Sequence, residues 1–262
     1  MIDIHCHILP GIDDGAGNLE ESIQMCNLAS HDGIKTIVAT PHTMNGLYIN
    51  NRHLIKKKVY DLNNSLKDNN IDIVIIPGAE VHVNYNIMEL LNQGFAITVN
   101  DANKYLLLEL PVYTVPPKIE EQIFQLKLEG ITPIFSHPER NTAIQNNLNI
   151  IYKIIKQGGL MQITSLSLTG EFGAAAQECA LTMLNLNLAH IIASDAHSTG
   201  IRSPRISEGL EIARRIVGEN YARDMAITFP QAIISGHLLD SLIPEPKAPE
   251  KSFFQKLFSK LR

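Results

Sequence analysis

Short apolar runs recur along the chain and alternate with longer amphipathic stretches. We expect seven strands at these runs, namely Ile2–His5, Thr36–Ala39, Ile71–Ile76, Tyr105–Glu109, Thr132–Phe135, Leu160–Thr164 and His190–Ser194. Most of the runs are continuously apolar rather than alternating, which is typical of parallel strands covered on both faces.

The stretches between these runs carry helix signals. Asn18, followed three residues later by Glu21, resembles a capping box and predicts a helix that extends to about Ser30. Further helices are expected near Arg52–Asn69, Ile119–Glu129, Asn147–Lys156, Gly173–Leu186 and Pro204–Val217. The alternation of strand and helix favours an α/β fold, either a (β/α) barrel or an open doubly wound sheet. No glycine-rich phosphate loop follows the first strand, which argues against a dinucleotide-binding version of the open sheet.

Composition narrows the class of protein. Among 262 residues, 22 Lys and Arg stand against 27 Asp and Glu, so the net charge is −5 and gives no sign of nucleic acid as a partner. No apolar run approaches the roughly 18 residues that suggest a membrane span. The N-terminus does not resemble a signal peptide, and the three scattered cysteines form no disulfide framework. We therefore expect a cytoplasmic globular protein.

The C-terminal segment differs from the rest of the chain. Pro244, Pro246 and Pro249 predict a stiff linker, which divides the chain into a domain at 1–243 and a linker with tail at 244–262. Lys251–Arg262 has a charge of +4, against −9 for the rest, and its Phe and Leu residues repeat at helical spacing. Such a basic amphipathic segment predicts peripheral contact with an anionic membrane or docking on a partner. The alternative is that it packs back onto the domain or frays.

The strongest chemical signal is a set of His, Asp and Glu residues that end or follow successive strands. The set consists of His5, His7, Asp14, His42, Glu80, Glu109, His137, Asp195 and His197. In a parallel barrel the carboxyl ends of all strands open onto one rim, so these side chains could converge there. One lone histidine would be a surface residue; nine donors at six strand ends favour two or three divalent ions. Mixed imidazole and carboxylate donors suit Mn, Fe or Zn better than Ca or Mg.

At these residues the sequence resembles a known family. The motifs are His5-Cys6-His7, Asp14, Thr40-Pro41-His42, Gly78-Ala79-Glu80, Ser136-His137-Pro138-Glu139-Arg140 and Ser194-Asp195-Ala196-His197. They are similar to the polymerase and histidinol phosphatase (PHP) superfamily. More closely, they resemble its manganese-dependent bacterial protein-tyrosine phosphatases of capsule and exopolysaccharide clusters, from Met1 to about Leu242. Many relatives have Ser in place of Cys6, and we expect little consequence because alternation points Cys6 away from the metals.

The resemblance implies a distorted (β/α)7-type barrel with three divalent ions, preferably Mn²⁺, at the C-terminal rim. By that pattern His5, His7 and Asp195 bind a first ion, which Glu80 bridges to a second. Glu109 and His137 complete the second site. Asp14, His42 and His197 bind the third ion.

Two arginines match positions that hold the substrate phosphate in this family. They are Arg140 and Arg202, and Arg205 is a nearby competitor of Arg202. An arginine can clamp phosphate oxygens with two parallel hydrogen bonds. A cysteine-dependent phosphatase would instead need Arg six residues after the nucleophile, and none of the three cysteines has one. For the remaining histidines we expect surface or structural roles; they are His31, His53, His82, His190 and His237. His82 follows Glu80 by two residues and could face the rim.

The predicted activity is hydrolysis of phosphotyrosine by metal-activated water. The resemblance implies that the substrate is the tyrosine-rich tail of a membrane-bound bacterial tyrosine kinase that controls polysaccharide export. One alternative within the fold is a small-molecule phosphatase, such as histidinol-phosphatase or a nucleotide phosphoesterase. Another is a non-enzymatic regulator that binds the kinase, which the complete set of nine donors argues against.

Overall fold

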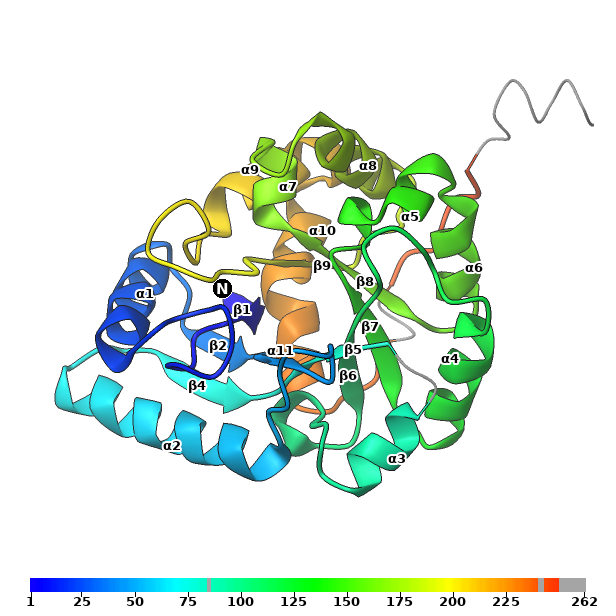
Figure 1. Cartoon of the computed structure of the whole chain (residues 1–262). Coiled ribbons are helices and arrows are strands. Elements are labelled where there is room, and N and C mark those ends of the chain that lie inside the picture. The colour runs from blue at the N-terminus through cyan, green and yellow to red at the C-terminus, as the bar shows by residue number, and fades with distance from the viewer. Residues whose placement is uncertain (84–85, 240–242, 250–262) are drawn as a thin grey trace, which may run out of the picture.

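The computed structural model describes residues 1–83, 86–239 and 243–249, and its strands form two parallel sheets (Figure 1). The first sheet has the order β1 (Ile2–Cys6), β2 (Thr36–Ala39), β4 (Val74–Pro77). The second has the order β3 (His42–Thr43), β5 (Glu80–His82), β6 (Tyr105–Glu109), β7 (Thr132–Ser136), β8 (Leu160–Thr164), β9 (Ile191–Ala193). All strand pairs are parallel, which confirms the expected α/β class.

Two short strands were not expected from the sequence. β3 follows β2 after Thr40 and Pro41, and β5 follows β4 after Gly78 and Ala79. Pro41 has no backbone N–H to donate to a strand ladder. A Cβ at Gly78 would lie 2.7 Å from Val38 Cγ1, so the turn after β4 approaches β2 closely there. The predicted third strand also begins later than expected, at Val74 rather than Ile71.

Backbone hydrogen bonds connect the two sheets next to β1. The Asp195 N–H donates to His5 O at 2.8 Å, and the His7 N–H donates to Ala196 O at 2.9 Å. The segment that follows β9 therefore runs beside the end of β1. This contact brings residues from opposite ends of the chain to the same edge of the fold.

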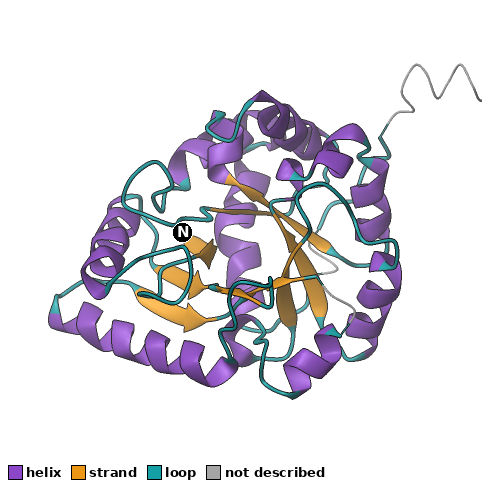
Figure 2. Ribbon diagram, in the orientation of Figure 1, coloured by secondary structure: helices purple, strands orange, loops and turns teal. Residues whose placement is uncertain are grey.

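Helices surround the strands (Figure 2). The six expected ones are α1 (Leu19–His31), α2 (Arg52–Asp68), α4 (Ile119–Leu128), α6 (Asn149–Lys156), α8 (Ala174–Asn185) and α9 (Ser207–Val217). Asn18 caps α1 as predicted, since its Oδ1 accepts from the Glu21 N–H at 3.0 Å. Shorter helices that sequence periodicity did not indicate are α3 (Ile87–Asn92), α5 (Thr142–Asn146), α7 (Ser165–Thr169), α10 (Glu219–Arg223) and α11 (Phe229–Ile234). None of the helices in the described ranges combines the length and apolarity that a bilayer span requires.

The C-terminal helix α11 covers one end of the sheets. Its Phe229 and Ile233 belong to a buried apolar cluster with residues of both sheets, including Ile4 of β1 and Leu107 of β6. In Figure 1 α10 and α11 lie behind the strands. This packing leaves the carboxyl ends of the strands as the open side, which we call the rim.

Residues 243–249 run against the body of the protein. The Lys247 N–H donates to Leu186 O at 2.8 Å, and the Asn187 side chain donates to Glu245 O at 3.2 Å. Lys156 lies 3.4 Å from Glu245. The proline-containing segment is thus held beside the end of α8. The tail Lys251–Arg262 lies outside the described residues.

Candidate metal centre and phosphate site

All nine predicted metal ligands come together at the rim. The structure places their nitrogen and oxygen atoms in four overlapping groups, within each of which the atoms lie within 4.8 Å of one another. The groups are His7 with Asp14, His42 and His197; His5 with His7 and Glu80; His5 with His137 and Asp195; and His42 with Glu80 and Glu109. His42 and Glu80 reach this position from the short strands β3 and β5 rather than from loops.

Glu80 lies at the centre of the cluster and is fully buried. Its Oε2 is 3.4 Å from His5 Nε2 and 3.0 Å from His42 Nδ1. Its Oε1 accepts from Ser136 Oγ at 2.5 Å and lies 2.9 Å from His137 Nε2. Burial opposes ionisation of this carboxyl group, but the imidazoles around it, His5 and His137 foremost, hold its pKa well below the ordinary value. Glu80 is therefore an anion that contacts His5 and His42 with one oxygen and His137 with the other.

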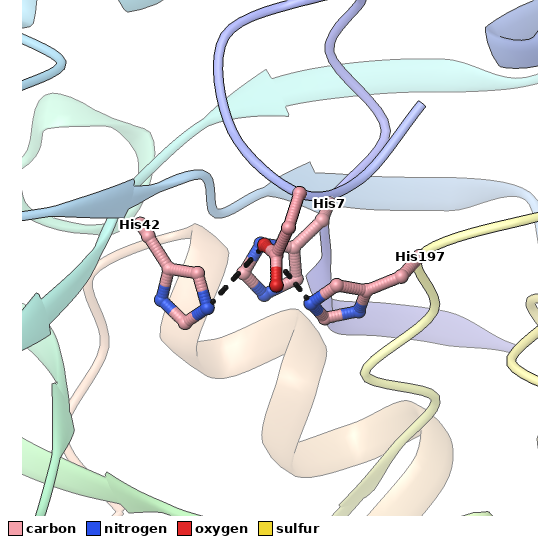
Figure 3. A group of neighbouring side chains, drawn as sticks. His7, His42 and His197 are labelled. Atoms are coloured by element: carbon pink, nitrogen blue, oxygen red, sulfur yellow. Dashed lines mark ion pairs between the residues drawn. The ribbon is translucent and has the colours of Figure 1, made fainter. Parts of the chain in front are cut away.

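Asp14 belongs to one group of donors with His7, His42 and His197, the three imidazoles labelled in Figure 3. Its Oδ1 lies 3.6 Å from His42 Nε2 and 3.5 Å from His197 Nε2, while His7 lies between these two rings. The contact with His197 is the main reason why the pKa of Asp14 is lowered. Burial lowers the pKa of His197, which favours the neutral imidazole that a metal ion requires.

Three of the histidines are oriented by contacts of their outer ring nitrogen. Nδ1 of His5 lies 2.8 Å from Gln162 Oε1, and Nδ1 of His7 lies 2.7 Å from Asp13 Oδ2. Nδ1 of His197 lies 3.0 Å from Asp195 O. If each Nδ1 carries the proton, each Nε2 offers its lone pair to the centre. This is the usual arrangement behind metal-binding histidines.

The cluster fits divalent ions by the chemistry of its donors. His5 Nε2 and His7 Nε2 are 3.2 Å apart, and carboxylate oxygens of Glu80 and Asp195 lie within 3.5 Å of them. His42 Nδ1 and Glu80 Oε2 are buried and have no hydrogen-bond partner among the described residues. A divalent cation bound by both atoms would satisfy these buried groups. Imidazole nitrogens with carboxylate oxygens, and no thiolate, suit Mn, Fe or Zn.

The other histidines differ in their distance from this centre. His82 Nδ1 lies 3.6 Å from Glu109 Oε2, so His82 borders the cluster, as its position two residues after Glu80 suggested. His31, His53 and His237 are exposed. His190 is buried elsewhere, where its Nδ1 accepts from the Met161 N–H at 2.9 Å.

Arg140 and Arg202 converge on one oxygen of Asp195. Arg140 Nη2 donates to Asp195 Oδ2 at 2.6 Å, and Arg202 Nη2 donates to the same atom at 2.8 Å. Burial opposes ionisation of Asp195, but Arg140 and then His5 hold its pKa well below the ordinary value. The Nε atoms of both arginines are buried without a hydrogen-bond partner among the described residues. Arg205 instead lies 3.5 Å from Glu208.

A cavity of about 320 Å³ opens beside these groups. Its lining includes Asp14, Glu109, His137, Arg140 and Arg202. Two arginine side chains and a cluster that fits divalent cations thus border one space. Such a space suits an anionic group with several oxygens, such as a phosphate ester.

The residues His137 and Asp195 both have left-handed backbone conformations. Their φ angles are 34° and 51°, which non-glycine residues seldom adopt and which recur at functional sites. The turn after His137 is fixed by Glu139, a fully buried carboxyl whose Oε1 accepts from the Thr164 N–H at 2.9 Å and from Ser167 Oγ at 2.6 Å. The turn therefore holds His137 and Arg140 against β8 and α7.

Sequence reasoning missed three residues that support the site, namely Asp13, Gln162 and Glu139. Asp13 directly precedes the predicted ligand Asp14, and Glu139 lies within the quoted family motif, but no role was predicted for either residue from the sequence. Gln162 is 157 positions from its partner His5. An inward-facing polar residue on an otherwise apolar strand was the one available signal for Gln162.

Comparison with known proteins agrees with this geometry. The family described as "Capsular polysaccharide synthesis, CpsB/CapC" matches residues 1–235. The tyrosine-protein phosphatase YwqE of Bacillus subtilis is 38% identical over 218 residues, which cover 83% of this chain and 85% of YwqE. The putative tyrosine-protein phosphatase CapC of Staphylococcus aureus is 32% identical over 254 residues, with 97% and 99% covered.

Solved structures extend the comparison to the fold. One from the crystal structures of YwqE from Bacillus subtilis and CpsB from Streptococcus pneumoniae, unique metal-dependent tyrosine phosphatases, matches with a TM-score of 0.91 at 33% identity. The match covers 96% of this chain and 100% of the other. A histidinol phosphate phosphatase from Lactococcus lactis matches at 14% identity with a TM-score of 0.54, over 83% of this chain and 93% of the other, which shows a shared fold alone. The chain is a member of the CpsB/CapC family of capsular polysaccharide synthesis.

Proposed function

We propose that this protein is a metal-dependent protein-tyrosine phosphatase that acts in capsular or exopolysaccharide synthesis. The observation that carries the proposal is the convergence of nine metal-type donors and two arginines on one cavity. High-coverage relatives named as tyrosine-protein phosphatases support the same activity. The thiol route has no support, since Cys6, Cys26 and Cys179 are all buried.

We assign the nine donors to three divalent ions, preferably Mn²⁺, with Fe or Zn as alternatives. His5, His7 and Asp195 would hold one ion, which Glu80 bridges to a second held by Glu109 and His137. Asp14, His42 and His197 would hold the third. The third set falls within one group of donors, which His7 also joins. Glu80 groups both with His5 and His7 and with His42 and Glu109, as expected of a bridge, whereas His137 groups with His5 and Asp195 rather than with Glu109. When bound, such ions would make water a stronger nucleophile at neutral pH and neutralise charge on the phosphoryl oxygens.

In this mechanism the protein's own residues bind and orient the ester. Arg140 and Arg202, which both line the cavity, would bind the nonbridging oxygens and so orient the phosphorus toward the metal-type donors. Asp195 Oδ2 accepts from both guanidiniums and holds them together. The leaving phenol has a pKa near 10, so its departure needs little or no protonation by a side chain.

We further propose that the two sheets form one distorted (β/α)7-type barrel. Two backbone bonds between the segment after β9 and the end of β1 support this closure, namely Asp195 N–H to His5 O at 2.8 Å and His7 N–H to Ala196 O at 2.9 Å. The buried cluster that combines residues of β1 and β6 is consistent with a shared interior. We also propose that residues 1–243 form one domain and that residues 244–262 form a linker and tail.

For the substrate we propose a phosphotyrosine-bearing protein, in particular a membrane-bound bacterial tyrosine kinase that controls polysaccharide export. We place the enzyme in the cytoplasm, where thiols stay reduced, with peripheral contact to the membrane through its tail. A small-molecule phosphatase is the alternative, because a histidinol phosphate phosphatase shares the fold.

The test combines metal analysis with two substrates. Purified protein should contain transition metal, lose activity in excess chelator, and regain it with Mn²⁺. It should hydrolyse phosphotyrosine peptides with a kcat/KM well above that for histidinol phosphate. The reverse preference would support the alternative, and chelator-resistant turnover would reject metal dependence.

A further inference from the structure

Phe172 lies on the short segment between α7 and α8, with glycines on both sides. Gly170 has φ +98° and Gly173 has φ +90°, conformations that side-chain-bearing residues rarely adopt. The Glu171 N–H donates to Leu166 O at 3.0 Å, and the Gly173 N–H donates to Gly170 O at 2.9 Å. The segment is thus a tight turn that fixes where the phenyl ring stands.

The ring of Phe172 lies against both arginines of the site. Arg140 Cζ is 4.5 Å from the ring centroid, and Arg202 Cζ is 5.7 Å from it. Both distances are within the roughly 6 Å over which a guanidinium is attracted to an aromatic face. The two cations share Asp195 Oδ2 as well, so they lie close together and repel each other. One carboxylate and one ring face offset this repulsion.

We propose that Phe172 is a positioning residue that holds Arg140 and Arg202 in the orientation that binds phosphate. Arginine side chains lose rotamer freedom when they bind an anion, and a stacked guanidinium has already lost part of it. The ring therefore raises phosphate affinity without contacting the reacting atoms. This inference rests on the proposed function, because it assigns the arginines to the phosphate of the substrate.

The test uses the full-length, metal-loaded protein and the variants F172L, F172Y and F172W. F172L keeps an apolar side chain of similar size but removes the aromatic face. We expect F172L to raise both the KM for a phosphotyrosine peptide and the inhibition constant of inorganic phosphate roughly 5- to 30-fold, as loss of two cation–π contacts implies. The kcat should change less than threefold. F172Y and F172W should stay within about threefold of the wild type in all three constants.

A matched control is F124L. Phe124 is an exposed aromatic residue on α4 that is not part of the site, so its replacement should alter none of these constants. A second control measures the energetic coupling between Phe172 and Arg202 in a double-mutant cycle. In an R202A background the effect of F172L should be smaller than in the wild type, since one of its two contacts is already absent. F172M serves if F172L is poorly folded by circular dichroism.

The inference is overturned if F172L binds inorganic phosphate as tightly as the wild type, or if F172Y is as impaired as F172L. A loss confined to kcat would also overturn it. Failure of the proposed function would give a different experimental result. In that case the wild type would not hydrolyse phosphotyrosine, yet calorimetry would still show tighter binding of inorganic phosphate to the wild type than to F172L.

Discussion

Asp13 Oδ2 lies 2.7 Å from Nδ1 of His7, and both side chains are buried. The same oxygen accepts from the His42 backbone N–H at 3.0 Å, while Oδ1 accepts from the Gly15 N–H. One carboxylate therefore orients a ligand just after β1 and a ligand on β3. Although it is no ligand in our assignment, Asp13 controls how two ligands face the centre.

Replacement of Asp13 should weaken metal binding without removing a ligand. We expect Asp13→Ala to lower metal affinity by about 10- to 100-fold, because His7 loses the partner that fixes its ring and tautomer. Titration of activity against Mn²⁺ concentration measures this shift, and excess metal should restore much of the activity. Asp61→Asn is the control, since Asp61 is an exposed partner of Lys57. An Asp13→Ala protein with unchanged metal dependence would contradict the role.

Activity should depend on metal ligands and not on thiols. Cys6 has no exposed surface, and its Sγ lies 3.8 Å from Ala196 O, a contact that a serine hydroxyl can replace. Cys6→Ser should therefore keep most of the activity. His5→Ala or Asp195→Ala should lose several orders of magnitude in kcat/KM. Thiol-sensitive turnover that survives excess chelator would show that this view is wrong.

Arg202 and Arg205 should differ sharply under substitution. Arg202 lines the cavity, whereas Arg205 pairs with Glu208 on the helix surface. Arg202→Lys should raise the KM for phosphotyrosine at least tenfold, because a point charge replaces a two-pronged donor. Arg205→Ala should leave the kinetic constants within about twofold. The opposite pattern in steady-state kinetics would transfer the phosphate role to Arg205.

Deletion of Lys251–Arg262 should separate recruitment from catalysis. Turnover of a small soluble phosphoester should barely change, while binding to anionic vesicles weakens, since each basic residue near such a surface contributes roughly 1 kcal/mol. Co-sedimentation with vesicles at low and high salt measures the effect. Equal binding with and without the tail would reject membrane contact. A large fall in thermal stability would show instead that the tail packs on the body.

His190 should make the protein less stable in acid. Burial lowers its pKa from 6.5 to about 4, so between these values the unfolded chain binds a proton that the folded chain does not. This contribution to stability is complete above pH 6.5 and is lost as the pH falls toward 4, at up to about 1.4 kcal/mol per pH unit. His190→Asn, whose amide oxygen can still accept from Met161, should flatten the dependence in urea unfolding between pH 7 and 4. The exposed His31→Asn is the control, and an unchanged slope in His190→Asn would refute the assignment.

The sequence predicted much of this arrangement because its signals are local. Apolar runs mark the longer strands, Asn18 marks the start of α1, and strand ends mark the ligand positions. The interruption of strands at Pro41 and Gly78 was not predicted, since it depends on which chains approach each other. The support given by Gln162, Glu139 and Phe172 was not predicted either, because it arises from contacts between segments distant in sequence, such as that of Phe172 with Arg202.

Glu245 and Lys247 are anchored beside Leu186, on a different side of the enzyme from the cavity. Leu186 precedes β9, so Glu245 and Lys247 lie at the amino ends of the strands, whereas the cavity opens at their carboxyl ends. A five-residue strand such as β8 spans about 16 Å, and at least this thickness separates the two. A partner bound at Glu245 and Lys247 would therefore meet the side of the enzyme opposite the cavity. Only a phosphorylated segment long enough to bend round the molecule, or one offered by a neighbouring copy of the partner, would then reach the arginines.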